Sequence, residues 1–92
     1  MSEDGWKPDP YVLARLVDTL SRNGPMKRTN LQMSARLNYS ALTRYVDWMS
    51  QHSLVGINED EGSQMVVLTQ KGKDAQEAFV KWLAKVFDSY TF

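Results

Sequence analysis

Apolar and polar positions alternate along the 92-residue chain in patterns that separate helical from extended segments. Between Tyr39 and His52, Leu42, Val46 and Met49 recur at i, i+4 and i+7, which predicts one buried stripe along a helix. Asn38 precedes this helix, and asparagine is a favoured N-cap. We expect the opposite face of the helix to be solvated and polar, with Ser40, Thr43, Arg44, Asp47 and Gln51.

A shorter helix is predicted just before it. Thr29 and Gln32 have the spacing of a capping box, in which each side chain accepts a backbone N–H of the other residue. Leu31 and Ala35 lie four residues apart, and Leu37 follows at the end of this helix. A short helix, a brief turn and a longer helix with a polar outer face form the helix-turn-helix pattern, whose second helix can lie in a DNA major groove.

The chain before this pair predicts another helix and a short strand. Asp9 and Pro10 have the N-cap and first-turn chemistry of a helix start, and Asn23-Gly24-Pro25 has the chemistry of a helix end. Met26 to Arg28 is apolar and basic, and we interpret it as a three-residue strand leading into the Thr29 cap. Four apolar residues of the first helix have helical spacing: Leu13, Leu16, Val17 and Leu20.

The chain after the pair predicts a β-hairpin and a long helix. Two apolar runs, Leu54–Ile57 and Gln64–Thr69, flank a turn that we place at Asn58–Ser63. Thr69 can cap the final helix; Gly72 weakens its first turn, and Ala75–Tyr90 is strongly helical. The predicted order is helix, short strand, helix, helix, hairpin, long helix, which makes a mainly α fold with a small antiparallel hairpin.

Three stretches resemble the winged helix-turn-helix family. Leu37 to Val55 looks like its recognition helix running into the first wing strand, with Ser53 where the family usually has glycine. Val67 to Gly72 is similar to the L-T-x-K-G that closes the wing. The aromatic-rich final helix looks like that of small archaeal winged-helix DNA-binding proteins, which dimerise through a C-terminal coiled coil. The resemblance covers Pro10 to about Tyr90.

The pattern and the resemblance together divide the chain into three parts. Residues 1–8 are expected to form a flexible N-terminal tail, residues 9–70 the winged helix-turn-helix domain, and residues 71–92 a C-terminal helix for packing and dimerisation. In the polar tail Trp6 is the exception, and we interpret it as an apolar anchor.

The resemblance implies a DNA-binding transcriptional regulator that contacts duplex DNA through the helix Tyr39–His52. Serine and threonine can hydrogen-bond to any base edge, and Arg44 can hold guanine through two bonds, whereas Asp47 would repel phosphate unless it accepts from cytosine. Tyr39 can bond a phosphate or pack its ring on the core. An ordinary solvated helix face is the alternative for the whole set. The predicted DNA-binding residues are Lys27, Arg28, Thr29, Arg36, Tyr39, Ser40, Thr43, Arg44, Lys71 and Lys73.

Charge complicates this interpretation. Eleven Lys and Arg balance eleven Asp and Glu, so the net charge is zero. Because DNA affinity comes largely from basic residues that displace phosphate counterions, the charges must be segregated on the surface for DNA to bind. The predicted wing tip, Asn58–Glu61, is acidic and opposes phosphate contact. A protein-interaction module that kept the winged fold and lost DNA binding is therefore the alternative function.

Composition narrows the remaining classes. There is no cysteine and His52 is the only histidine, so a zinc finger, a disulfide framework and a Cys–His catalytic pair are excluded. No phosphate loop, dinucleotide motif or nucleophile elbow is present, and we expect no enzyme activity, no cofactor and no metal. With no apolar run of about 20 residues and an acidic N-terminus, we expect a cytoplasmic protein without a membrane span.

The final helix predicts a second contact surface. Its apolar side chains form a stripe that is wide and rich in large aromatics, which is more than a three-helix core needs. We expect a homodimer in which part of the stripe packs on its own domain and part on the partner; packing within one chain is the alternative. The predicted dimer-interface residues are Phe79, Trp82, Leu83, Val86, Phe87 and Tyr90.

Overall fold

The computed structural model describes residues 5–89, with side chains described for residues 5–86. The elements within this range follow the order predicted from the sequence, and the mainly α fold with a hairpin wing is confirmed. They are α1 (Pro10–Asn23), β1 (Met26–Lys27), α2 (Arg28–Ala35), α3 (Tyr39–Gln51), β2 (Val55–Asp60), β3 (Ser63–Leu68) and α4 (Gln70–Ser89).

The core lies between α1, α2, α3 and the inner face of the sheet. The predicted apolar stripe of α3 is fully buried, with Leu42, Val46 and Met49 at most 1% exposed. The stripes predicted for α1 and α2 also reach this core, although Leu13 is only partly buried. The largest buried side chains are Leu16, Leu20, Leu31, Leu42, Met49, Val46 and Val66.

Two predicted helix caps are confirmed. The Asp9 carboxylate accepts a hydrogen bond from the backbone N–H of Tyr11 at 2.8 Å, at the start of α1. The Asn38 side-chain oxygen accepts from the backbone N–H of Ala41 at 2.7 Å, at the start of α3. Each bond satisfies an N–H that has no partner inside its helix, and so fixes where the helix begins.

The predicted start of α2 is wrong. The helix begins at Arg28, with Lys27 as an N-cap that makes no side-chain bond, so Thr29 and Gln32 do not form a capping box. The reason is the strand before it: Met26 and Lys27 pair with β3, and the chain turns from β1 directly into α2. Thr29 consequently lies exposed inside the first turn of the helix rather than before it.

The hairpin is confirmed, but its turn is shorter than predicted. The sheet has the order β1-β3-β2 and is antiparallel, and the β2–β3 ladder runs as far as Asp60 opposite Ser63. The turn is therefore Glu61-Gly62, not Asn58–Ser63. Both residues have positive φ, 51° and 80°, which is what a two-residue type I′ turn requires. Because this turn matches the twist of the strands, pairing continues through the acidic residues up to the tip.

The start of α4 is tied to the end of α3. The Thr69 hydroxyl accepts from the backbone N–H of Gly72 at 3.0 Å, which confirms Thr69 as the cap. The same hydroxyl donates to the carbonyl of Ser53 at 2.5 Å, and the Thr69 N–H donates to the carbonyl of Leu54 at 3.0 Å. Gly72 is required here, since a Cβ would lie 2.2 Å from the Leu54 carbonyl oxygen.

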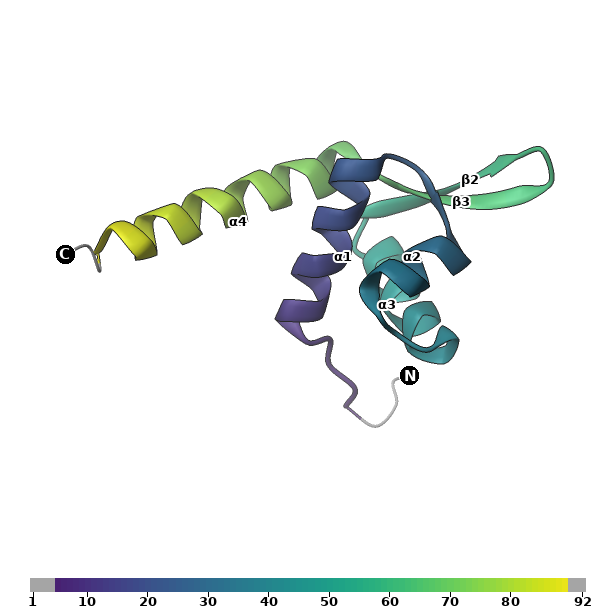
Figure 1. The fold of residues 1–92 in the computed structure, drawn as a ribbon, viewed down its shortest axis with the longest axis horizontal. Helices are drawn as coiled ribbons and strands as arrows, with labels where there is room; N and C mark the ends of the chain where they lie inside the picture. The colour runs from purple at the N-terminus through teal and green to yellow at the C-terminus, as the bar shows by residue number, and fades with distance from the viewer. Residues whose placement is uncertain (1–4, 90–92) are drawn as a thin grey trace.

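Beyond this junction α4 leaves the domain. Figure 1 shows α4 projecting from one end of the molecule and the β2–β3 wing from the other, with α1 beside the first half of α4. The predicted extension of the helix to Tyr90, and the Phe87 and Tyr90 side chains, lie outside the described residues. Of the helices within residues 5–89, none combines the length and apolar character that a membrane crossing requires.

Candidate nucleic-acid interface

The outer face of α3 is the part of the structure that matches the predicted DNA-reading surface. Because the helix buries its apolar stripe, Ser40, Arg44, Asp47 and Gln51 are turned to solvent. No carboxylate among the described residues lies within ion-pair distance of Arg44. The guanidinium charge of Arg44 is therefore available to an anion that approaches α3.

Arg44 does have a neighbour that sequence reasoning missed. Its guanidinium carbon lies 5.2 Å from the centroid of the Trp6 ring, a cation–π arrangement. Trp6 in turn meets the ring of Tyr45 edge-on, with centroids 5.3 Å apart and an interplanar angle of 76°. The backbone N–H of Asp9 donates to the Tyr45 hydroxyl at 2.9 Å. The segment before α1 is thus fastened to α3, and the interpretation of Trp6 as an anchor is confirmed.

The other predicted base-contacting residues differ in their access to solvent. Thr43 is half-buried; its Oγ1 has no accessible surface and no hydrogen-bond partner among the described residues. A contact between Thr43 and a base stays a prediction, and it requires the side chain to turn outward. Tyr39, at the start of α3, is 51% exposed, whereas Tyr45 is 8% exposed. Of the two tyrosines of α3, Tyr39 is the one that can reach a phosphate.

The flanking basic residues lie at three junctions of the fold. Lys27 is exposed and Arg28 half-buried where β1 turns into α2, and Lys71 and Lys73 are exposed in the first turns of α4. Arg36 is exposed at the turn between α2 and α3, with φ 60° and ψ 44°. That these cations, with Thr29, face one DNA duplex stays a prediction.

The Arg36 turn sets where α3 begins. The backbone N–H of Arg36 donates to the carbonyl of Met33 at 3.2 Å, and that of Leu37 to the carbonyl of Gln32 at 3.1 Å. These are the two bonds of a Schellman motif, which ends α2 with one left-handed residue. The motif joins α2 to α3 through a fixed turn, as a helix-turn-helix requires.

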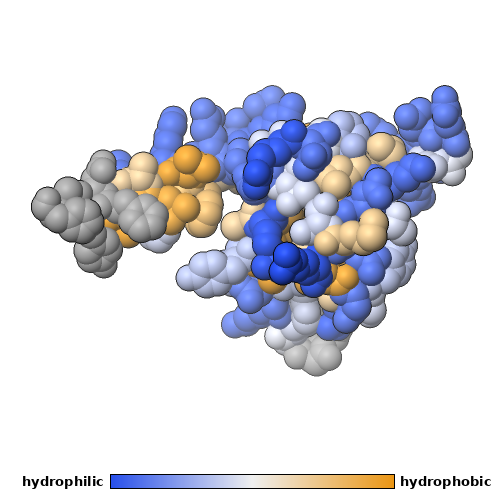
Figure 2. Space-filling view, in the orientation of Figure 1, coloured by the Kyte–Doolittle hydropathy of each residue, from blue (hydrophilic) through white to orange (hydrophobic). Residues whose placement is uncertain are grey.

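The wing has the opposite charge. Glu59, Asp60 and Glu61 are exposed at and beside its tip, and the hairpin from Val55 to Leu68 contains no Lys or Arg. In Figure 2 this end of the molecule is hydrophilic. Phosphate contact through the wing is therefore electrostatically unfavourable.

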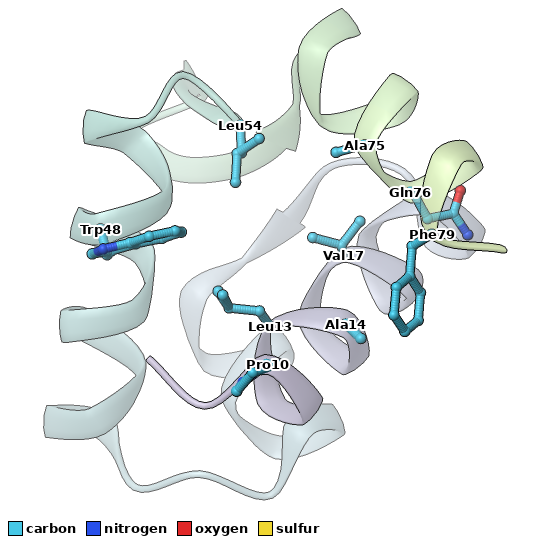
Figure 3. A pocket seen from close by; sticks show the side chains of 9 residues that line it. All are labelled: Pro10, Leu13, Ala14, Val17, Trp48, Leu54, Ala75, Gln76 and Phe79. Carbon is cyan, nitrogen blue, oxygen red and sulfur yellow. The ribbon is translucent and has the colours of Figure 1, made fainter. Parts of the chain in front are cut away.

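A second feature lies behind α3, on the side of α1 and α4. An apolar groove of about 240 Å³ opens there (Figure 3). Trp48 forms one wall, and its ring stacks on that of His52 with centroids 4.0 Å apart. His52 also lies with its Nδ1 2.9 Å from the carbonyl of Trp48, at the end of α3. The groove is lined by Pro10, Leu13, Ala14, Val17, Trp48, Leu54, Ala75, Gln76 and Phe79.

The apolar surface continues from the groove along α4. Phe79 is 40% exposed, Val80 51% and Trp82 57%, and Phe79 and Trp82 stack with centroids 6.2 Å apart. Leu83 and Val86 are half-buried. Figure 2 shows hydrophobic surface on the half of α4 that projects from the domain. Single exposed apolar residues are ordinary on a protein surface, but a contiguous patch of this kind marks a contact surface.

No three His, Cys, Asp or Glu side chains among the described residues gather as a metal ion would need.

Comparisons with known proteins give the same architecture. A winged helix-turn-helix family model matches residues 14–86. No curated protein sequence matches the chain. Among solved structures, the chain is similar to a MarR family protein from Bacillus stearothermophilus, with 24% identity and a TM-score of 0.75 over 94% of this chain and 64% of that chain.

Two further solved structures are similar. One is a MarR family transcriptional regulator from Silicibacter pomeroyi, with 28% identity and a TM-score of 0.70 over 85% of this chain and 56% of that chain. The other is Sso10a-2, a DNA-binding protein from Sulfolobus solfataricus, with 16% identity and a TM-score of 0.69 over 90% of this chain and 88% of that chain. The chain spans less than two thirds of the length of the two MarR-family chains.

Proposed function

Because the chain belongs to the winged helix-turn-helix family, we propose that it is a DNA-binding transcriptional regulator that acts as a homodimer. In this proposal α3 enters the major groove and the activity is binding, without catalysis. One observation carries it: Arg44 is exposed on the outer face of α3, and no carboxylate among the described residues is paired with it. A cation in that position can hold a phosphate or read the edge of a guanine.

The acidic wing shapes how such a complex forms. Glu59 and Asp60 keep the wing from neutralising phosphates, so α3 and the basic residues beside it must supply the contacts. Each phosphate contact contributes about 0.9 to the slope of log affinity against log salt. We therefore expect a shallow salt dependence compared with winged-helix proteins whose wings are basic.

The test is fluorescence anisotropy with labelled duplex DNA at two salt concentrations. If Arg44 reads guanine, Arg44→Ala should weaken binding by about 1–3 kcal/mol. If Arg44 holds a phosphate, the loss of affinity should be the same for every DNA sequence. Arg22→Ala is the matched control, because it removes the same charge from a side chain that is already paired with Asp18 in α1. Equal affinities of the wild type and Arg44→Ala would remove Arg44 from the interface.

A protein-interaction module is the second candidate, and the acidic wing favours it. Glu59, Asp60 and Glu61 form an exposed negative end that suits a basic partner better than DNA. Wild-type protein that binds no duplex even at low salt, while remaining folded, would contradict DNA binding and favour this alternative.

The apolar face of α4 supports the homodimer. Phe79 and Trp82 are large and exposed, and they lie beside a groove that is itself apolar. Covering this surface with the same surface of a second copy gives a two-fold interface in which both patches are buried. A two-fold dimer can also present two copies of α3 to successive major-groove faces, about 34 Å apart.

Sedimentation velocity at micromolar concentration tests the dimer. Wild-type protein should sediment as a dimer, and Trp82→Ala should shift the equilibrium toward monomer because it removes the largest exposed ring of the patch. Lys81→Ala is the control, since Lys81 is exposed in the same turn and carries no apolar ring. A monomeric wild type at these concentrations would contradict the dimer and leave DNA binding to be judged separately.

A further inference from the structure

We propose that Trp6 is a positioning residue for DNA binding, which holds the guanidinium of Arg44 in the orientation that meets the nucleic acid. The inference rests on the proposed function and adds a residue from outside the helix-turn-helix unit. It starts from three contacts that form a chain: Asp9 to Tyr45, Tyr45 to Trp6, and Trp6 to Arg44.

The contacts among Asp9, Tyr45 and Trp6 hold the indole in a fixed position. Tyr45 is 8% exposed in α3, and its hydroxyl accepts from the backbone N–H of Asp9, the N-cap of α1. The cap position is itself fixed, because the Asp9 carboxylate accepts from the N–H of Tyr11. Trp6 is half-buried against the core and meets the Tyr45 ring edge-on, the favoured geometry for two aromatic rings. The indole is therefore held in place before any ligand arrives.

The contact between Trp6 and Arg44 orders a side chain that makes no ion pair with any other described residue. An exposed arginine samples many rotamers, and ordering it on binding costs conformational entropy. At 5.2 Å from the ring centroid, the Arg44 guanidinium rests on the indole, which restricts these rotamers in advance. The guanidinium carbon lies over the ring, and a guanidinium carries five N–H donors, more than contact with one ring can occupy.

Trp6 could either position Arg44 for DNA or cover it and block DNA, and the structure favours positioning. Arg44 remains exposed although Trp6 contacts it, so an anion can still reach its N–H donors. If Trp6 instead covered Arg44, its removal would free the cation and tighten DNA binding. The direction of the change in affinity on removing the indole therefore decides between the two roles.

The experiment is a double-mutant cycle read by fluorescence anisotropy on one duplex at one low salt concentration. Trp6→Ala should weaken binding about 2- to 5-fold, which is the size of a cation–π contact at an exposed site. Trp6→Phe, which keeps an aromatic face, should restore most of the affinity. In the Arg44→Ala background, Trp6→Ala should have no further effect, since a positioning residue acts only through its partner.

A measurement without DNA complements the cycle. In the NMR spectrum of the wild type, the Arg44 side-chain protons should be shifted upfield by the indole ring current, and Trp6→Ala should abolish the shift. Absence of that shift in the wild type would overturn the proposal even if Trp6→Ala fails to fold.

The outcomes distinguish this proposal from the one it rests on. Wild-type binding with unchanged or tighter binding by Trp6→Ala would overturn the positioning role and leave the DNA-binding function standing. Equal losses from Trp6→Ala in the wild-type and Arg44→Ala backgrounds would assign Trp6 a purely structural role and overturn the proposal as well. A folded wild type that binds no duplex would overturn both.

Discussion

Helices α3 and α4 have the same kind of sequence pattern and opposite surroundings. Both carry an apolar stripe at helical spacing. In α3 the stripe is the centre of the core, where Leu42 and Met49 have no exposed surface. In α4 the stripe is open to solvent, where Phe79 is 40% and Trp82 57% exposed.

The difference comes from what each helix can touch. The α2–α3 turn at one end of α3 and the β2 strand at the other hold it against α2 and the sheet. After its first turns, α4 lies beside α1 and then projects from the domain (Figure 1). An amphipathic pattern therefore predicts that one face of a helix is buried, but not whether it is buried within the same chain or against a partner.

The largest effect on stability is expected from a substitution in the buried stripe of α3. Leu42→Ala should lower the free energy of unfolding by about 2–5 kcal/mol, because it opens a cavity at a fully buried site. Val80→Ala, on the exposed face of α4, should cost less than about 1 kcal/mol. Chemical denaturation at low protein concentration measures both. Equal losses of stability in the two variants would mean that the apolar face of α4 is buried in an oligomer in solution.

The junction between the two helices gives the next largest effect. Gly72→Ala should lower the free energy of unfolding by about 1–3 kcal/mol, because its Cβ would overlap the Leu54 carbonyl oxygen and α4 would have to shift. Gly56→Ala is the matched control: its Cβ would meet the nearest atom, on Val67, at 3.9 Å. Thermal melts of both variants check this. A wild-type melting temperature for Gly72→Ala would show that α4 is not fixed to the domain at this point.

The sequence predicted the elements well where one residue's chemistry decides the outcome. Asp9, Asn38 and Thr69 each accept a backbone N–H as their side chains suggest, and the helices begin after them. The prediction failed at Thr29, because strand pairing of β1 moves the cap of α2 two residues earlier, to Lys27. It also failed at the wing, where three consecutive acids suggested a loop although Glu59 and Asp60 are paired in the strand and only Glu61 lies in the turn. The partners of β1 lie far along the chain in β3, so the periodicity around Thr29 does not contain them.

The candidate site shows the same limit. The exposed position of Arg44 follows from the period of α3 alone. The contact with Trp6 does not, since residues 38 positions apart meet only once α1 has folded against α3. The sequence showed only a tryptophan in a polar tail. This predicted that Trp6 anchors the tail, but not which residues it contacts. The burial of the Thr43 hydroxyl was likewise not predicted from the sequence.

The smallest expected effect concerns the residue that ends α3. Ser53 has φ 62°, a left-handed conformation that costs a residue with a Cβ about 1 kcal/mol. Its N–H donates to the carbonyl of Ser50 at 3.0 Å, and the N–H of Leu54 donates to that of Met49 at 2.8 Å, which together make a Schellman motif. This geometry explains why glycine is usual at this position in the family that the sequence resembles.

Ser53→Gly should therefore raise the free energy of unfolding by up to about 1 kcal/mol. Ser50→Gly, exposed inside α3, should lower it by about 0.5 kcal/mol, because glycine there gains no left-handed advantage and loses helix propensity. Denaturant titrations of both variants measure whether the free energy of unfolding rises or falls. Because the Ser53 carbonyl accepts from Thr69, the cap of α4, a destabilised Ser53→Gly would mean that serine serves the α3–α4 junction better than its backbone strain suggests.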